Sequence, residues 1–242
     1  MNQSYLRVPM FAKVSQSRRE ILMLGLLAGV PMSTVWALSI PGISDAEASS
    51  GLKAALEKAG VAAIGILGKQ DGFMGNDKVR IPLPGFLNDA AKIGKALGMG
   101  KKIDELTLSM NRAAESAVPM AKDAIVGAAR SLTLGDAKNI VTGGQTSVTD
   151  FFKSKTDSPL YGKFLPMVTK VVSQTSLVQQ YNGLVEKLPG AATKGDSVKV
   201  ENHVTRKALD GMFYMIGQQE IGFRQNPMGA GGVIGKVFGA LK

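Results

Sequence analysis

The single histidine of this 242-residue chain lies among polar residues with helical spacing near the C-terminus. His203, Arg206, Lys207, Asp210 and Tyr214 fall within about 100° of one another on a helical wheel. A histidine oriented by a carboxylate could act as a general acid or base. A solvated helix face has the same composition, and we favour that interpretation because a lone histidine rarely acts without an orienting partner.

Asn111, Arg112 and Glu115 form a second candidate group. Asn111 and Glu115 border the apolar side of a predicted helix, whereas Arg112 points away from it. A buried Asn or Glu needs hydrogen-bond partners. Arg80 precedes the stiff segment Ile81–Pro84 and could bind Glu115 through two parallel hydrogen bonds. We predict that this group clamps a loop onto the helix, with ligand binding as the alternative.

Several kinds of chemistry are excluded by residue type. The chain has no cysteine and one histidine, which removes disulfides, thiolate sites, a cysteine nucleophile and multi-histidine metal centres. No P-loop, nucleophile elbow, zinc-protease or calcium-loop motif occurs, and Gly229–Gly235 lacks the last glycine of a dinucleotide fingerprint. We therefore expect no metal and no cofactor. Catalysis by carboxylates alone stays open, since paired Asp or Glu residues leave no linear signature.

The first 37 residues have the pattern of a cleaved signal peptide. A short apolar stretch at Ile21–Val30 follows a basic region, and Val35–Ala37 fits a cleavage site. Ser17–Leu22 also resembles a twin-arginine export signal, so the export route stays open between that pathway and general secretion. The apolar stretch spans only about 15–18 Å as a helix, too short for a bilayer core of about 30 Å. The basic region contains Arg7, Lys13, Arg18 and Arg19.

The chain that remains after export, residues 38–242, is basic. It carries 25 Lys and Arg against 18 Asp and Glu, a net charge of +7. Export to the periplasm of a Gram-negative envelope would exclude nucleic acid and leave anionic lipid, cell-wall polymer or an acidic protein as partners. Solubility alone would also explain the charge. Without cysteine the chain cannot be a lipoprotein, and we expect no transmembrane segment after residue 37.

Apolar residues recur at helical spacing along almost all of residues 38–242. The exception is a segment rich in Gly and Pro at 70–85, which two prolines force into an extended path. We predict a single all-α domain, an irregular multi-helix bundle of about eight or more helices, with this loop packed over it. The expected helices are 44–68, 86–97, 103–118, 121–131, 133–140, 146–154, 159–174 with a break at Pro166, 177–188, 198–223 and 233–242.

The C-terminal segment 229–242 is amphipathic. Its large apolar side chains share one side of a helix, and Lys236 lies on the other. Burying that side would release similar free energy in a membrane surface or in the protein's own core. We favour docking on the bundle and keep contact with a membrane surface as the alternative. The apolar residues are Val233, Ile234, Val237, Phe238 and Leu241.

Four sequence blocks resemble a known bacterial family. They are DGFMGNDKVRIPLPG at 71–85, SMNRAAESAVPMAK at 109–122, SLTLGDAKNIVTGG at 131–144 and VTRKALDGMFYMIGQQE at 204–220. Together with the C-terminal KVFGAL, they resemble the domain of unknown function, family 4197, over about residues 44–241. The resemblance implies an exported or envelope helical domain without an assigned activity. The chain departs from the family at residues 217–220. We associate this part of the family with a run of acidic residues, but here it reads Gly-Gln-Gln-Glu, so the resemblance supports no cation site there.

We therefore expect a non-enzymatic periplasmic protein that binds an apolar or anionic envelope component, related to lipid or cell wall. The expected site is a groove between helices, roofed by the loop Asp71–Gly85. The alternatives are a carboxylate-dependent envelope hydrolase and a structural partner of another envelope protein. A deep apolar pocket would favour ligand binding, paired carboxylates in a wet cleft would favour the enzyme, and a flat apolar patch would favour the partner. The oligomeric state is left open.

Overall fold

A computed structural model describes residues 42–133, 135, 137–187 and 199–241, and every regular element in these ranges is helical. The predicted all-α fold is confirmed. The predicted signal peptide lies outside the described residues. In chain order the elements are α1 (Asp45–Leu67), α2 (Gly85–Ala96), α3 (Gly100–Ala117), the 3₁₀ helix η1 (Val118–Ala121), α4 (Lys122–Ser131), α5 (Ala137–Val141), α6 (Ser147–Ser173), α7 (Leu177–Val185), α9 (Val200–Gln225), α10 (Pro227–Ala230) and α11 (Gly232–Gly239).

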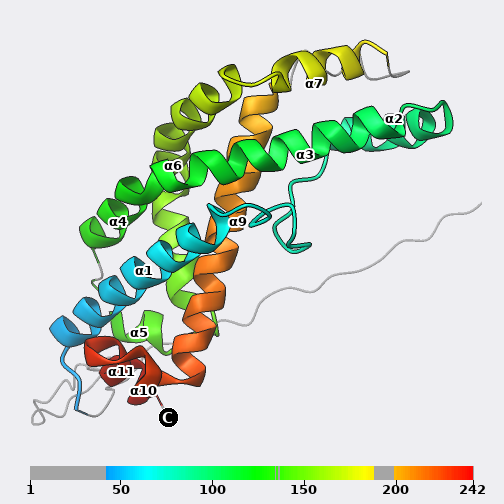
Figure 1. Ribbon diagram of the computed structural model, residues 1–242. Helices are drawn as coiled ribbons and strands as arrows, with labels where there is room; N and C mark the ends of the chain where they lie inside the picture. Colours follow the sequence, from blue (N-terminus) through cyan, green and yellow to red (C-terminus); the bar gives the residue numbers. More distant parts are fainter. Residues whose placement is uncertain (1–41, 134, 136, 188–198, 242) are drawn as a thin grey trace, which may run out of the picture. The chain divides into compact units, whose positions relative to one another are not determined.

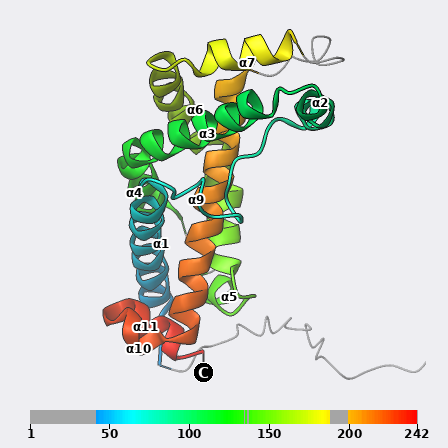
Figure 2. The same cartoon turned by 45° about the vertical axis from the view of Figure 1, so that its right-hand side comes forward.

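Helix α9 forms the centre of the bundle, packed against both α1 and α6 (Figures 1 and 2). Half of its residues are buried, among them two glycines, Gly211 and Gly217, that let neighbouring chain segments approach closely. Phe213 on α9 meets Phe152 on α6 edge to face, with ring centroids 5.8 Å apart. The C-terminal helices α10 and α11 lie at one end of α9 and α7 lies near the other (Figure 2).

Helix α1 begins with a capping box. The Ser44 hydroxyl accepts from the Glu47 amide at 3.2 Å, and the Glu47 carboxylate accepts from the Ser44 amide at 2.9 Å. Glu47 also pairs with Lys236 of α11. Hydrogen bonds from Lys236 and Ser44 lower the pKa of Glu47 to about 2. The cap thus joins the start of α1 to the last helix of the chain.

The prediction of a break near Pro159 and at Pro166 was wrong, because α6 is one continuous helix with both prolines inside it. Each proline removes one backbone hydrogen bond, at a cost of about 3 kcal/mol or more. Leu160, Phe164 and Val168 are buried along the same stretch. Burial of such side chains contributes about 1.5–3 kcal/mol each, which offsets the lost hydrogen bonds.

The loop between α1 and α2 packs into the bundle as predicted, and its apolar side chains belong to the core. Phe73 and Ile81 are completely buried, and Val79 nearly so. The Phe73 ring lies so close to Gly211 of α9 that a Cβ at Gly211 would come within 2.8 Å of it. Asp71 has a positive φ of 63°, uncommon for a residue other than glycine. The loop is wedged between α3 and α9.

The C-terminal helix α11 packs against α1 and α9, so the docked alternative describes it. Val237 and Phe238 are buried, and Phe238 lies 6.3 Å from Phe223 between ring centroids. A Cβ at Gly51 of α1 would come within 2.5 Å of Val237, so glycine is required there for contact. Ile234, Val237 and Phe238 are buried, and Val233 and Leu241 are partly buried, so most of the apolar side of α11 faces the protein.

Among the described helices, none combines the length and apolar character needed to cross a membrane.

Candidate functional site

Asn111 of α3 fixes the loop, because its side chain forms hydrogen bonds with both the amide and the carbonyl of Ile81. Its side-chain oxygen accepts from the Ile81 amide at 2.8 Å, and its side-chain nitrogen donates to the Ile81 carbonyl at 2.9 Å and to the Thr107 carbonyl at 2.8 Å. Asn111 is fully buried, and these contacts use its whole donor capacity. The residue is therefore a buried structural clamp between α3 and the loop.

Glu115, one turn further along α3, holds the start of the loop. One carboxylate oxygen accepts from the amides of Phe73 and Met74, both at 3.1 Å. The other accepts from Arg112 at 2.6 Å, and Arg112 also donates to Asp71 at 2.7 Å. These hydrogen bonds to Glu115 and Asp71 raise the pKa of Arg112. Glu115 therefore clamps the loop onto α3, and the cation that pairs with it is Arg112.

The predicted contact between Arg80 and Glu115 was wrong. Arg80 donates instead to the Met74 carbonyl at 2.8 Å and pairs with Asp77 at 3.1 Å, so it closes the loop on itself. Backbone amides and Arg112 already occupy the Glu115 carboxylate. A second guanidinium would have to displace one of these donors.

His203 of α9 holds the other side of the loop. Its Nε2 lies 2.8 Å from the Pro82 carbonyl, which can only accept, so Nε2 carries the proton. Burial lowers the pKa of His203, the hydrogen bond to Pro82 raises it in part, and the charge of Lys207 lowers it further. The histidine is therefore a neutral hydrogen-bond donor to the loop.

Arg206 and Asp210 of the same predicted face bind to α6. Arg206 forms a bidentate pair with Asp157 at 2.9 and 2.6 Å, and Asp210 lies 3.5 Å from both Arg206 and Lys153. Burial lowers the pKa of Arg206, but Asp157 and Asp210 outweigh it, so the pKa is raised. Lys207 and Tyr214, the remaining members of the predicted face, are exposed. On this face, His203 thus contacts the loop, Arg206 and Asp210 form ion pairs with α6, and the other two side chains are in solvent.

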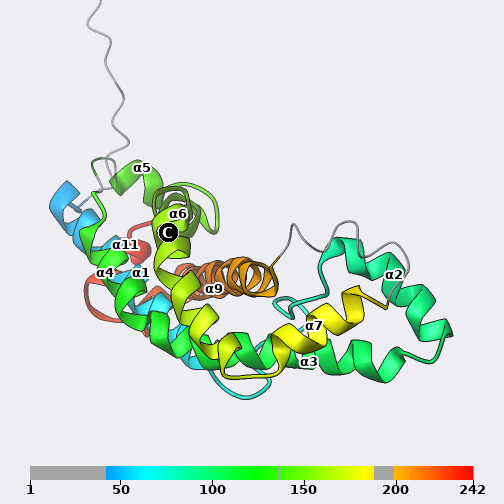
Figure 3. The same ribbon diagram turned by 90° about the horizontal axis from the view of Figure 1, so that it is seen from above.

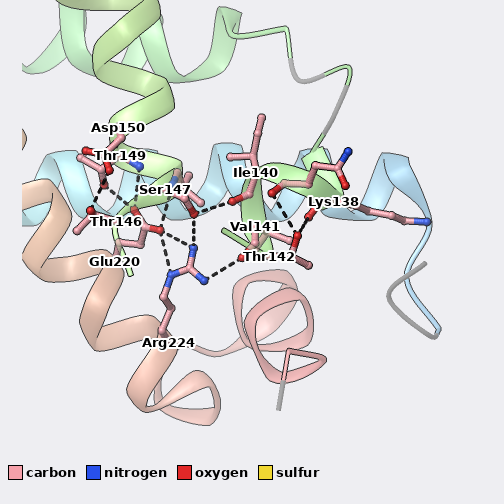
Figure 4. A network of polar contacts seen from close by, with 12 residues as sticks. Lys138, Ile140, Val141, Thr142, Thr146, Ser147, Thr149, Asp150, Glu220 and Arg224 are labelled. Carbon is pink, nitrogen blue, oxygen red and sulfur yellow. Dashed lines mark hydrogen bonds and ion pairs between the residues drawn. The ribbon is translucent and has the colours of Figure 1, made fainter. Parts of the chain in front are cut away.

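Glu220 and Arg224 form a buried network that the sequence analysis missed (Figure 4). Glu220 accepts from the amides of Val148 and Thr149, at 3.1 and 2.8 Å, and from the Thr149 hydroxyl at 2.7 Å. These amides belong to the first turn of α6, so a carboxylate from α9 caps that helix. Arg224 donates to Glu220 at 2.7 Å. The four-residue separation of Glu220 and Arg224, typical of ion pairs along a helix, was the sequence feature that could have identified this pair.

Arg224 extends this network to α5 and α11. It donates to the Val141 carbonyl at 2.8 Å and to the Ser147 hydroxyl at 2.9 Å, and its guanidinium lies 5.2 Å from the centre of the Phe238 ring (Figure 4 shows the polar contacts). Ser147 in turn donates to the Ile140 carbonyl at 2.6 Å. Because its groups are satisfied within the protein, the network fastens four helices together.

Two cavities follow the seam between α6 and α9. One, of about 320 Å³, is bordered by Asp150, Lys153 and Asp210, and the other, of about 460 Å³, by Asp157, Arg206 and the Tyr161 ring. The first contains two carboxylates, as the enzyme alternative requires. Asp150 accepts from the Thr146 hydroxyl at 3.0 Å, and Asp210 is neutralised by Lys153 and Arg206. Both cavities therefore contain positive and negative groups in near balance.

A larger cavity, of about 700 Å³, lies between α4 and α6. Two lysines of α6, Lys155 and Lys163, border it, and no carboxylate of the described residues does. Its walls are otherwise apolar residues, glycine and hydroxyl groups. Its lining consists of Gly127, Ala128, Ser131, Leu132, Thr133, Lys155, Thr156, Pro159, Leu160 and Lys163.

The two lysines are well placed to act together. Both are exposed, and their spacing of eight residues separates their Cα atoms by about 12 Å along the helix. The Lys155 ammonium lies 5.7 Å from the centre of the Phe151 ring. Pro159, which also borders the cavity, cannot donate to the Lys155 carbonyl. The cavity therefore offers cations at its edge and an apolar wall between them.

None of the predicted site residues borders this cavity, and neither does the loop at 71–85. The expected groove roofed by that loop stays a prediction, and the loop's buried side chains pack between α3 and α9. Within the described ranges, no three acidic or histidine side chains come close enough together to hold a metal ion.

Comparison with known proteins gives one match. The family model described as "Protein of unknown function (DUF4197)" matches residues 42–239. No curated protein and no solved structure matches the chain significantly. The family description names no activity, so a functional argument has to start from the geometry of the site.

Proposed function

The chain belongs to the DUF4197 family of proteins of unknown function, and we propose that it is a non-enzymatic periplasmic protein that binds an amphipathic anion between α4 and α6. The single observation that carries this proposal is the charge of the α4–α6 cavity. Among the residues that the structure describes, Lys155 and Lys163 border it without any carboxylate, whereas the cavities along α6 and α9 contain both signs.

The size and lining of the cavity support a lipid-like ligand. Its volume of about 700 Å³ is within the range of sites for small ligands, which is about 300–1,000 Å³. Leu132, Pro159 and Leu160 offer an apolar wall for an alkyl chain, and the lysines offer charge-assisted hydrogen bonds to a carboxylate or phosphate. A ligand with one anionic end and an apolar body matches both.

Binding of dodecanoate to residues 38–242, below its micelle concentration, tests this proposal by calorimetry. Lys155→Gln with Lys163→Gln should weaken binding by about tenfold or more, since each charge-assisted contact contributes about 1.5–3 kcal/mol. Lys153→Gln is the matched control on the same helix, because Lys153 pairs with Asp210 outside the cavity. Equal affinities for the double variant and the control would overturn the proposal.

A second pair of variants tests the apolar part of the cavity. Gly127 borders the cavity, and a Cβ there would meet no atom within 4 Å. Gly127→Leu should therefore fill the space and block dodecanoate while leaving the fold intact. Gly162→Leu is the control, because Gly162 also faces open space but lies outside the cavity lining. Unchanged binding by Gly127→Leu would place the ligand elsewhere.

The periplasmic part of the proposal rests on the sequence pattern of residues 1–37. Mass spectrometry of the protein from its native cells, after separation of periplasm and cytosol, should find a chain that begins at Leu38 in the periplasm. Intact protein confined to the cytosol would contradict it. Lysine substitution of both Arg18 and Arg19 should abolish export if the twin-arginine route is used, and leave it unchanged under general secretion.

A further inference from the structure

A further cavity, of about 340 Å³, lies between α3 and α7. The two helices pack against each other, and Figures 1 and 3 show α7 beside α3. Two lysines, one glutamate, two glutamines and an apolar side chain border this α3–α7 cavity. It shares no lining residue with the α4–α6 cavity. The lining consists of Lys102, Glu105, Gln179, Gln180, Gly183, Leu184 and Lys187.

The charged groups of the α3–α7 cavity are little used within the protein. Lys102 and Lys187 are exposed, and no carboxylate of the described residues forms an ion pair with either of them. Glu105 lies 3.9 Å from Lys101, which is beyond hydrogen-bond distance, and both of these side chains are more than half exposed. Such a pair is weak. Glu105 therefore keeps its capacity to accept hydrogen bonds, and the two lysines keep their capacity to donate.

Gln180 adds a polar atom that lacks a partner. Its Nε2 donates to the Ser176 hydroxyl at 3.0 Å. Its Oε1 is shielded from solvent and accepts no hydrogen bond from a described residue. A shielded acceptor costs free energy until it is bonded. Because Gln180 as a whole is only partly buried, rotation of its side chain can turn Oε1 into the cavity, where a ligand that donates hydrogen bonds would remove this cost.

This set of groups requires both charges in one ligand. Glu105 would repel a purely anionic ligand, and Lys102 and Lys187 would repel a purely cationic one. Lys102 and Glu105 are three residues apart on α3, so their Cβ atoms lie about 5–6 Å apart on the helix surface. An ammonium and a carboxylate carried by the same carbon atom are close enough together to meet both side chains. The cavity volume, near the lower end of the usual range of about 300–1,000 Å³, suits such a small molecule.

We propose that the α3–α7 cavity binds a free α-amino acid with an apolar side chain. The carboxylate of the ligand accepts hydrogen bonds from Lys102 and Lys187. Its ammonium donates to Glu105 and to Oε1 of Gln180, and its side chain packs against Leu184. The proposal does not depend on the ligand of the α4–α6 cavity.

A nuclear magnetic resonance titration of residues 38–242 with leucine tests this proposal. Leucine should give saturable shifts in the backbone amides of residues 102–105 and 179–187. At the same amides, 4-methylpentanoate, which lacks the ammonium, and 3-methylbutylamine, which lacks the carboxylate, should each bind about tenfold more weakly or worse. The absence of saturable shifts with leucine, or equal binding of either analogue, would overturn the proposal. Shifts in residues 127–133 and 155–163 report the α4–α6 cavity, so the two ligand proposals can fail separately.

Variants of single charges identify the groups that bind the ligand. Glu105→Gln should weaken leucine binding by about tenfold or more, without weakening the binding of 4-methylpentanoate. Glu186→Gln is the matched control, because Glu186 is exposed just after α7 and outside the cavity lining. Lys102→Gln should also weaken leucine binding, whereas Lys69→Gln, at an exposed position outside the lining, should not. Equal losses in a variant and its control would show an effect of net charge alone and overturn the proposal.

Gln180 can be tested by stability as well as by binding. Gln180→Met should weaken leucine binding and leave the urea midpoint of the ligand-free protein unchanged or higher, because the unbonded oxygen is removed with the amide. Gln174→Met, at an exposed position outside the cavity lining, is the control and should change neither quantity. A lower midpoint with unchanged leucine binding would make Gln180 a structural residue and overturn its place in the site.

Discussion

Glu115 and Glu220 are buried in the same way. Each accepts two consecutive backbone amides from another part of the chain, and each is paired with an arginine of its own helix. The carboxylates thus fasten a loop to α3 and the first turn of α6 to α9. Removing one would leave an arginine and two amides without their acceptor, which is more costly than the loss of one neutral hydrogen bond.

Glu115→Ala should therefore lower the free energy of unfolding by about 2–4 kcal/mol, because the amides of Phe73 and Met74 would lose their acceptor at about 1–3 kcal/mol each. Glu105→Ala on the exposed side of the same helix should change it by no more than about 0.5 kcal/mol. Arg80→Ala should cost about 1 kcal/mol or less, because Arg80 bonds only within the loop. Urea unfolding measures all three, and a larger loss for Arg80→Ala than for Glu115→Ala would contradict the clamp.

His203 should make stability depend on pH. Its pKa in the folded protein is below the ordinary value of about 6.5, so the unfolded chain takes up the proton more readily. Its stabilising contribution is complete above about pH 6.5 and is lost as the pH falls from there towards the folded pKa. His203→Gln should remove this component, measured as the difference between wild type and variant in urea midpoints across that range. The advantage of wild type over the variant should grow as the pH rises towards about 6.5, and an advantage that shrinks over that range would contradict a neutral donor to Pro82.

The residues of the loop clamp could be predicted from sequence, but their partners could not. Asn111 and Glu115 stand at the border of an apolar helix face, which identifies them as buried polar groups that need partners. The partners turned out to be mainly backbone groups of Phe73, Met74 and Ile81. Backbone amides have no residue-specific signature, whereas Arg80 stands next to the stiff segment Ile81–Pro84 and was therefore the partner expected from sequence.

At the scale of the elements, the helices follow the periodicity of the sequence, except where packing outweighs local preference. Most predicted ends are within a few residues of the observed ones, because caps such as Ser44 with Glu47 are readable locally. Helix α6 could not be read in this way. Its two prolines favour breaks, and only the burial of Leu160, Phe164 and Val168 by other helices keeps it continuous.

The wedge of the loop against α9 depends on a glycine. Gly211→Ala should destabilise the protein by about 1–3 kcal/mol, because the new methyl group would come within 2.8 Å of the buried Phe73 ring. Gly222→Ala in the same helix should instead stabilise it by about 0.5–1 kcal/mol, because its Cβ meets nothing within 4 Å. Thermal or urea unfolding distinguishes the two, and equal effects would mean that the loop does not pack closely on α9.

The docked C-terminal helix makes a further prediction. Phe238→Ala removes a buried ring that touches Phe223 and Arg224 and should cost about 3–5 kcal/mol of stability. Met228→Ala, at an exposed position in the neighbouring α10, should cost about 0.5 kcal/mol at most. An unchanged stability for Phe238→Ala would revive the alternative in which residues 229–242 serve a membrane surface.

At the scale of the whole molecule, the α4–α6 cavity arises from residues that are far apart in the sequence. Gly127 to Thr133 and Lys155 to Lys163 are joined only by folding, and nothing in either stretch alone indicates a site. The positive charge and the apolar helices led us to expect an apolar or anionic ligand under the loop at 71–85, which does not border this cavity. The proposed location depends on which lysines border a cavity whose described lining has no carboxylate, and that is a property of the packed bundle.

The most direct test of the α4–α6 site is a nuclear magnetic resonance titration of residues 38–242 with dodecanoate, following backbone amide shifts. We predict saturable shifts concentrated in residues 127–133 and 155–163, which disappear in the protein carrying Gly127→Leu. Saturable shifts centred instead on residues 146–153 and 210–218, or no saturable shifts at all, would contradict ligand binding between α4 and α6.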